Sequence, residues 1–160
     1  MNKINLAEIP IEKSRSPKGR FRRLSQHVSQ ALTGVNGLGT SGISQPFEVD
    51  LVRIPAGAVS WPYHSHSAQW EMYLILTGRG QVRTPGGTAD LREGDCIIHP
   101  PGEAHQITNT GATDLVYYII ADNPISDVCY YPDTNKWQVP GLPNPVHVAG
   151  VSNNYYDGEE

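Results

Sequence analysis

Short runs of β-favouring residues, separated by turns, constrain this 160-residue chain more than any other feature. From Phe47 onward these runs are "FEVDLVRI", "EMYLILTG", "GQVRTP", "DCIIH", "HQITN" and "LVYYIIA". The chain also contains 16 Gly and 13 Pro, which break helix interiors and form turns between short strands. The pattern predicts an all-β domain, an antiparallel barrel or sandwich, and indicates neither a parallel sheet nor crossover helices.

Turn-rich segments divide the chain into three predicted parts. Residues 1–45 lack sustained periodicity and are predicted to form a basic N-terminal arm and loop, with a short helix near Phe21 to Leu32. Residues 46–125 hold the β-favouring runs and are the predicted barrel. Residues 126–160 contain prolines that interrupt central strands, which is typical of a C-terminal tail that wraps over the barrel and packs on it.

The run from Met72 to Leu76 is apolar at nearly every position. A strand with this composition is covered on both faces, because an exposed face would alternate apolar with polar residues. We expect the N-terminal arm or a partner subunit to supply the second cover.

Charge is distributed unevenly along the chain. Residues 1–23 carry a net charge of +5 and the remainder −9, for a total of −4. A basic arm can bind nucleic acid, but no nucleic-acid-binding motif follows it and the acidic body would repel phosphate. We therefore expect no nucleic-acid partner, and an arm that aids solubility or docks on the body. Its basic residues are Lys3, Lys13, Arg15, Lys18, Arg20, Arg22 and Arg23.

Neither a membrane segment nor a secretory signal is indicated. No apolar run approaches the roughly 20 residues that span a bilayer, and the N-terminus has no apolar signal region. We expect a cytoplasmic protein without a membrane partner. Cys96 and Cys129 have no close Cys or His partner in the sequence and are predicted to be ordinary buried thiols.

Three histidines and one glutamate have a spacing that suits a metal ion. His64 and His66 are two apart, so both rings project from the same face of an extended strand. Glu71 follows a predicted turn at Ser67 to Gln69, after which it can point back into the same interior. His105 comes from a third segment, which "HPPGEA" turns sharply. Imidazole nitrogen and carboxylate oxygen suit Zn, Fe, Mn, Ni or Cu, so these four side chains are predicted to hold one divalent ion.

Four protein ligands leave two positions of an octahedral ion open for water, dioxygen or a chelating substrate. Other side chains near the ion are therefore candidates for catalysis or substrate binding. Tyr73 shares the face of Glu71 by parity, although packing in the core is an equal alternative. Glu103 is interpreted as a turn residue rather than a ligand. The candidate catalytic residues are Tyr73, Gln69 and His99, and the candidate substrate-binding residues are Trp61, Tyr63 and Tyr73.

Two stretches, "GAVSWPYHSHSAQWEMYLILTG" and "GDCIIHPPGEAHQITN", resemble the two signature motifs of the cupin superfamily. The four predicted ligands stand at the expected positions, as do Gly78, Gly94, Pro100, Gly102 and Asn109. One departure is that six residues rather than five separate Gly57 from His64, which suggests a bulge or a longer loop before the first ligand. The two motifs cover about a third of the chain.

The resemblance implies a double-stranded β-helix, a jelly-roll barrel of six to eight strands, with a metal near one mouth and a homodimeric assembly. The stretches "CYYPDTNKW" and "YYDGE" resemble single-domain bacterial cupins described as sugar or sugar-phosphate isomerases. The expected function is that of a metalloenzyme that isomerises a small chelating molecule such as a sugar or sugar phosphate. A metal-dependent dioxygenase and a non-catalytic small-molecule binding protein are the alternatives.

A sugar phosphate would require a cation near the metal. The body of the chain offers Arg53, Arg79, Arg83, Arg92 and Lys136. If none of these five lies near the ligand cluster, phosphate recognition is excluded.

Overall fold

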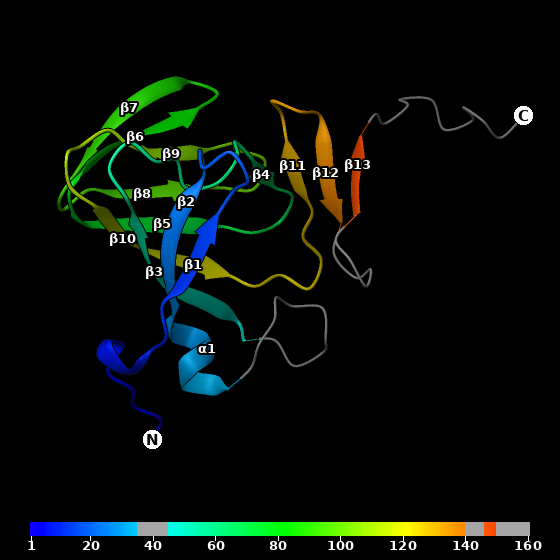
Figure 1. The fold of residues 1–160 in the computed structure, drawn as a ribbon. Helices are drawn as coiled ribbons and strands as arrows, with labels where there is room; N and C mark the ends of the chain where they lie inside the picture. Colours follow the sequence, from blue (N-terminus) through cyan, green and yellow to red (C-terminus); the bar gives the residue numbers. More distant parts are fainter. Residues whose placement is uncertain (35–44, 140–145, 150–160) are drawn as a thin grey trace, which may run out of the picture.

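Three antiparallel sheets make up the described part of this computed structural model, which covers residues 1–34, 45–139 and 146–149. The six-stranded sheet has the order β1-β2-β3-β10-β5-β8, and a three-stranded sheet, β7-β6-β9, lies beside it (Figure 1). The third sheet, β13-β12-β11-β4, joins the C-terminal tail to the barrel. Every pair of named strands in the described residues is antiparallel, so the all-β prediction is confirmed.

The elements follow one another in this order: a 3₁₀ turn (Leu6–Glu8), β1 (Glu12–Arg15), β2 (Arg22–His27), α1 (Val28–Thr33), β3 (Phe47–Ile54), β4 (Ser65–His66), β5 (Glu71–Thr77), β6 (Arg79–Thr84), β7 (Gly87–Arg92), β8 (Cys96–His99), β9 (Gln106–Asn109), β10 (Leu115–Asp122), β11 (Cys129–Tyr131), β12 (Lys136–Val139) and β13 (Val146–Ala149). Among the described residues, no helix has the length and hydropathy that a bilayer crossing needs.

The interior of the barrel changes from apolar to polar along the central strands. Val52 of β3, Tyr117 of β10 and Ile75 of β5 form one cross-strand row, and all three side chains are fully or almost fully buried. Further along the same strands the rows contain carboxylates and, on β8, His99. Because cross-strand partners point to the same side of a sheet, these polar residues share the inward face with the core. The polar end of the barrel is therefore the place for a site.

The N-terminal segment is more regular than the sequence predicts. Residues 22–27 form β2, which pairs with β3, and residues 12–15 form β1 at the edge of the same sheet. The helix is shorter than expected and covers only Val28–Thr33. Hydrogen bonding to the edge of β3 explains the difference, because such pairing depends on tertiary contact rather than local periodicity.

The predicted cover over Met72 to Leu76 is corrected in one respect. Met72 and Leu74 on the outer face of β5 are half-buried, whereas Tyr73 and Ile75 on the inner face are buried. The N-terminal strands β1 and β2 extend the sheet from β3, which β10 separates from β5. A partner subunit remains the predicted cover.

The C-terminal segment packs against the barrel through β11. Cys129 pairs with His66 and Tyr130 with Ser65, so the tail forms hydrogen bonds with β4. β12 then pairs with β11, and β13 with β12. The stretch "YYDGE", which carries part of the predicted resemblance, lies outside the described residues.

Candidate metal centre

Two chain segments bring the first and last predicted ligands together. His64 and His105 form an isolated antiparallel bridge, with backbone hydrogen bonds of 3.2 and 2.8 Å in the two directions. Their ring centroids are 4.7 Å apart. His66 ends β4 and Glu71 begins β5, as the predicted turn between them requires. Three separate segments thus converge at the polar end of the barrel.

The four predicted ligand side chains meet around the Glu71 carboxylate. Its Oε2 atom lies 2.7 Å from His105 Nε2 and 3.6 Å from His66 Nε2. One ligand atom from each of His64, His66 and Glu71 lies within 4.8 Å of the other two. Three imidazole nitrogens and a carboxylate oxygen are a donor set that suits a divalent transition metal.

The second nitrogen of each histidine ring is engaged outside the cluster. His64 Nδ1 lies 2.8 Å from the carbonyl oxygen of Pro62, and His105 Nδ1 lies 3.2 Å from that of Glu103. A carbonyl oxygen only accepts, so both Nδ1 atoms carry the proton and donate. His66 Nδ1 lies 2.6 Å from Asp127 Oδ2. This arrangement leaves each Nε2 for the centre, which is how metal-binding histidines are normally oriented.

The protonation of Glu71 and His64 favours cation binding, whereas that of His66 opposes it. Burial alone would raise the pKa of Glu71, but the hydrogen bond from His105 and the neighbouring imidazoles lower it to about 2, so this carboxylate is ionised. Burial, followed by the charge of His105, lowers the pKa of His64 to about 4, which keeps this ring neutral. Burial also opposes the charged form of His66, but hydrogen bonding to Asp127 outweighs it and raises the pKa to about 10. A bound cation would displace the His66 proton.

A cavity of about 220 Å³ opens beside the cluster and is lined by His64, His66 and Glu71. It is smaller than the roughly 300–1,000 Å³ of typical drug-sized sites, so it suits a small molecule. No lysine or arginine lines it among the described residues. Lys136 lines a different cavity, and Arg83 forms an ion pair with Asp133.

Three of the candidate residues line the small cavity. Tyr73 donates its hydroxyl proton to Glu71 Oε2 at 3.1 Å, and the Tyr73 hydroxyl oxygen lies 3.2 Å from His105 Nε2. Gln69 lines the cavity as well, with its amide nitrogen held by the carbonyl oxygen of Asp122 at 2.7 Å. Trp61 is the third, and the guanidinium of Arg23 lies 4.3 Å from the centroid of its ring.

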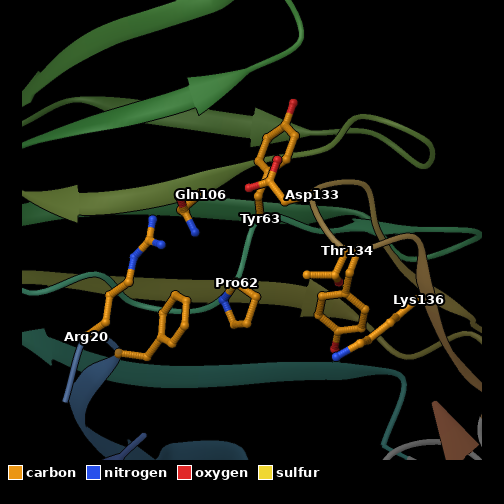
Figure 2. A pocket seen from close by; sticks show the side chains of 9 residues that line it. Arg20, Pro62, Tyr63, Gln106, Asp133, Thr134 and Lys136 are labelled. Atoms are coloured by element: carbon orange, nitrogen blue, oxygen red, sulfur yellow. The ribbon is translucent and has the colours of Figure 1, made fainter. Parts of the chain in front are cut away.

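The structure does not bring the other two candidates to this cavity. Tyr63 lines a neighbouring cavity of about 450 Å³ between the N-terminal segment and the tail (Figure 2). There the guanidinium of Arg83 lies 3.8 Å from the centroid of its ring. His99 is not among the residues lining the small cavity; it stacks behind His105, with ring centroids 4.0 Å apart, and its Nδ1 contacts Glu103 Oε1 at 2.7 Å. The Glu103 side chain therefore holds the His99 ring in place, in addition to its position in the turn.

Sequence reasoning missed several residues of the site. Glu48 and Asp50 of β3 line the cavity, and Asp127 anchors His66. The two β3 carboxylates have the same parity as buried Val52 and Ile54, a signal that the sequence carries. Asp127 leaves no such signal, because it lies 61 residues from its partner.

The prediction for the cysteines is wrong in part. Cys96 is exposed on β8, and Cys129 is half-buried with its sulfur 3.5 Å from His66 Nδ1. The apolar run around Cys96 belongs to a strand whose outer face is uncovered in the single chain, so parity placed this thiol outside.

The fold and the cluster together define a small antiparallel barrel with candidate metal ligands at one mouth. Residues 50–121 match the family model described as "Cupin domain". This part of the chain is a cupin domain, and the predicted resemblance is confirmed for it.

One curated relative of this domain has a name that refers to a ligand. An oxalate-binding protein of Thermotoga maritima is 35% identical over 69 residues, which are 43% of this chain and 56% of that protein. The chain spans about half the length of the curated relatives it matches.

Solved structures share the fold over more of the chain. A sugar phosphate isomerase of the cupin superfamily from Silicibacter pomeroyi aligns with a TM-score of 0.75 at 23% identity, over 94% of this chain and 97% of that one. A Thermotoga maritima protein described as a predicted oxalate decarboxylase aligns with a TM-score of 0.61 at 23% identity, over 76% of this chain and 99% of that one. Identities this low establish a common fold and leave the reaction to be argued from the site.

Proposed function

We propose that this chain is a divalent-metal-dependent isomerase of a small, uncharged hydroxy-carbonyl compound such as a free sugar. The observation that carries the proposal is the cavity beside Glu71, which three of the predicted ligands line, with His105 in contact with Glu71, and which no described lysine or arginine lines. His64, His66, Glu71 and His105 would hold the ion. When bound, it would polarise a carbonyl oxygen and so acidify the neighbouring C–H bond.

The charge of the cavity selects among the substrates. Glu48, Asp50 and Glu71 all line it, so apart from the bound ion no lysine or arginine there would offset the further negative charge of a phosphate group. None of the five cations of the body lines the cavity among the described residues. This argues against a sugar phosphate. Hydroxyl groups can donate to carboxylates, and a neutral sugar therefore fits.

The side chains around the cluster support an isomerase. Tyr73 places a hydroxyl at Glu71 and His105, where it can orient a substrate oxygen. Gln69 is held by Asp122, so its position on the cavity wall is well defined. Since Glu71 is committed to the cluster, the proton must be moved by another group.

The test combines metal analysis with a substrate screen. We expect one divalent ion per chain, and interconversion of an aldose and its ketose observed by NMR, with no conversion of the corresponding phosphates. Glu71→Gln should lose both metal and activity, whereas Asp133→Asn, which changes an exposed ion pair, should keep both. A metal-free active protein, or activity confined to phosphorylated sugars, would contradict the proposal. Stabilisation by a sugar without any turnover would favour the non-catalytic binding alternative.

A further inference from the structure

Two carboxyl groups of β3 line the cavity together with the candidate metal centre. Glu48 and Glu71 both pair with Ala121 of β10, from its two sides. Asp50 and Tyr73 flank Ile119 in the same way. Cross-strand partners share a face, so these acids point inward from a strand roughly 10 Å away from β5. A molecule in the cavity would lie between them and the cluster.

The carboxyl groups lie close to each other and to an imidazole. Ligand atoms of Glu48, Asp50 and His27 lie within 4.8 Å of one another. His27 Nδ1 contacts Asp50 Oδ2 at 2.8 Å, while its Nε2 lies 3.3 Å from Glu12 Oε2. One oxygen of Asp50 is thus held from behind by β2, which fixes the direction of the other.

Asp50 is also hydrogen-bonded to Glu48 through their side chains. Asp50 is only 7% exposed, and no N–H or hydroxyl group of the described residues donates to its Oδ1 atom. A hydrogen bond between two carboxyl groups requires a proton on one of them. Glu48 and Asp50 therefore form a proton-sharing pair on the wall of the cavity.

Glu48 is not needed to hold the His27 ring, because Asp50 and Glu12 contact its two nitrogens. A second buried acid beside Asp50 is electrostatically unfavourable if both are ionised. Burial, and then the charge of Asp50, raises the pKa of Glu48 to about 7. His27 opposes this shift and Glu71 adds to it, while the β10 side chains between them, Ile119 and Ala121, are uncharged. Arg23 of β2 and Glu12 of β1 also interact with Asp50, with opposite charges. The pair can thus hold one proton near neutral pH.

We propose that Glu48 and Asp50 are the catalytic acid–base pair of this site and exchange protons with the substrate. The inference rests on the proposed isomerase function. The ionised member removes the proton from the carbon next to the carbonyl, and that C–H electron pair becomes the C=C bond. The carbonyl π pair moves to oxygen, which takes the proton of the other member, and an enediol results.

The second half of the reaction restores the pair. The proton first removed is delivered to the former carbonyl carbon, where the C=C electron pair forms the new C–H bond. The neighbouring hydroxyl becomes the new carbonyl and gives its proton to the carboxylate that had lost one. Each group ends as it began, so no oxidant or further reactant is needed.

The experiment compares Glu48→Gln and Asp50→Asn with Glu93→Gln, an exposed acid in the turn before β8. All three variants should keep the metal content of the wild type. We expect kcat for sugar isomerisation, and exchange of the substrate C–H with solvent deuterium, to fall about 100-fold or more in the first two variants, with little change in KM. Glu93→Gln should match the wild type in both.

A second measurement does not depend on turnover by the variants. Carboxyl ¹³C NMR of the labelled wild type should show a glutamate that titrates near neutral pH, and Glu48→Gln should remove that signal.

The outcomes separate the two proposals. A wild type that converts no uncharged sugar would overturn the proposed function and this inference together. An active wild type whose Glu48→Gln and Asp50→Asn variants keep kcat within about threefold would overturn only the inference. Two metal ions per chain, with one lost in Asp50→Asn, would also overturn it, because the pair would then be a second cation site.

Discussion

At the scale of single residues, Asp127 joins a predicted metal ligand to the turn that follows it. Its Oδ2 atom accepts from His66 Nδ1, and its Oδ1 accepts from the backbone N–H groups of Ala68 at 2.9 Å and Gln69 at 3.3 Å. One carboxylate therefore sets both the ring orientation of His66 and the path of the chain toward Glu71. Loss of a carboxylate that hydrogen-bonds to a metal-binding histidine usually lowers metal affinity by a factor of about 10 to 100.

We predict that Asp127→Asn weakens metal binding about 10- to 100-fold, because the amide cannot offer His66 the same charged acceptor. Competition against a chromophoric chelator measures the change. Asp133→Asn is the matched control, since Asp133 pairs with exposed Arg83 away from the cluster. An unchanged affinity in Asp127→Asn would show that this contact does not support a ligand.

Glu48 should make the protein less stable as the pH rises. Its pKa is raised from the ordinary value of 4.5 to about 7 in the fold, so between these two values the native state binds a proton that the unfolded state has released. The free energy of unfolding then falls as the pH increases through this window. Glu48→Gln should remove that part of the slope, as measured by urea unfolding at pH 5 and pH 8. Parallel slopes in the two proteins would refute the prediction.

At the scale of elements, Asn109 ties the end of β9 to β3 and to the loop before β10. It is fully buried, and its amide nitrogen donates to the carbonyl oxygens of Ile54 at 2.7 Å and Thr113 at 2.8 Å. Its Oδ1 atom accepts from the N–H of Gly111 at 2.8 Å. The asparagine of the second sequence motif is thus a structural residue that closes one end of the barrel.

We expect Asn109→Ala to lower the free energy of unfolding by about 3 kcal/mol, because the buried backbone groups it serves would lose their partners. Urea titration of the metal-loaded protein measures this, and metal stoichiometry should not change. Thr110→Ala, at the exposed neighbouring position, provides the comparison. A loss of metal without a loss of stability would place Asn109 in the site instead.

At the scale of the whole molecule, the outer face of the six-stranded sheet has an apolar region that is exposed in the part of the chain that the structure describes. Ile98 on edge strand β8 is 56% exposed and pairs with Met72 of β5, and Trp70 just before β5 is 47% exposed. Contiguous apolar surface of this kind is typical of an interface between subunits. The homodimer remains a prediction, and this face is the one we expect it to use.

Replacing Ile98 with lysine should convert a dimer into a monomer, because an unpaired charge would be buried at the interface. Sedimentation velocity reads the result directly. Ile125→Lys is the control, since Ile125 is 79% exposed and lies in the segment between β10 and β11. A wild type that sediments as a monomer, or an Ile98→Lys variant that stays dimeric, would contradict the assignment.

Local sequence patterns alone predict the all-β fold and most of the candidate ligand cluster. Alternation and turn residues predict the all-β fold. The spacing of His64, His66 and Glu71 predicts that these side chains meet, since residues on one strand or across a short turn are fixed by local geometry, and the second sequence motif adds His105. Other features depended on the tertiary structure. Pairing of β2 with β3, the contact of Asp127 with His66, and the position of Glu48 and Asp50 on the cavity wall each join distant segments. Strand parity says which residues share a face, but only the packed sheet decides which face lies inside.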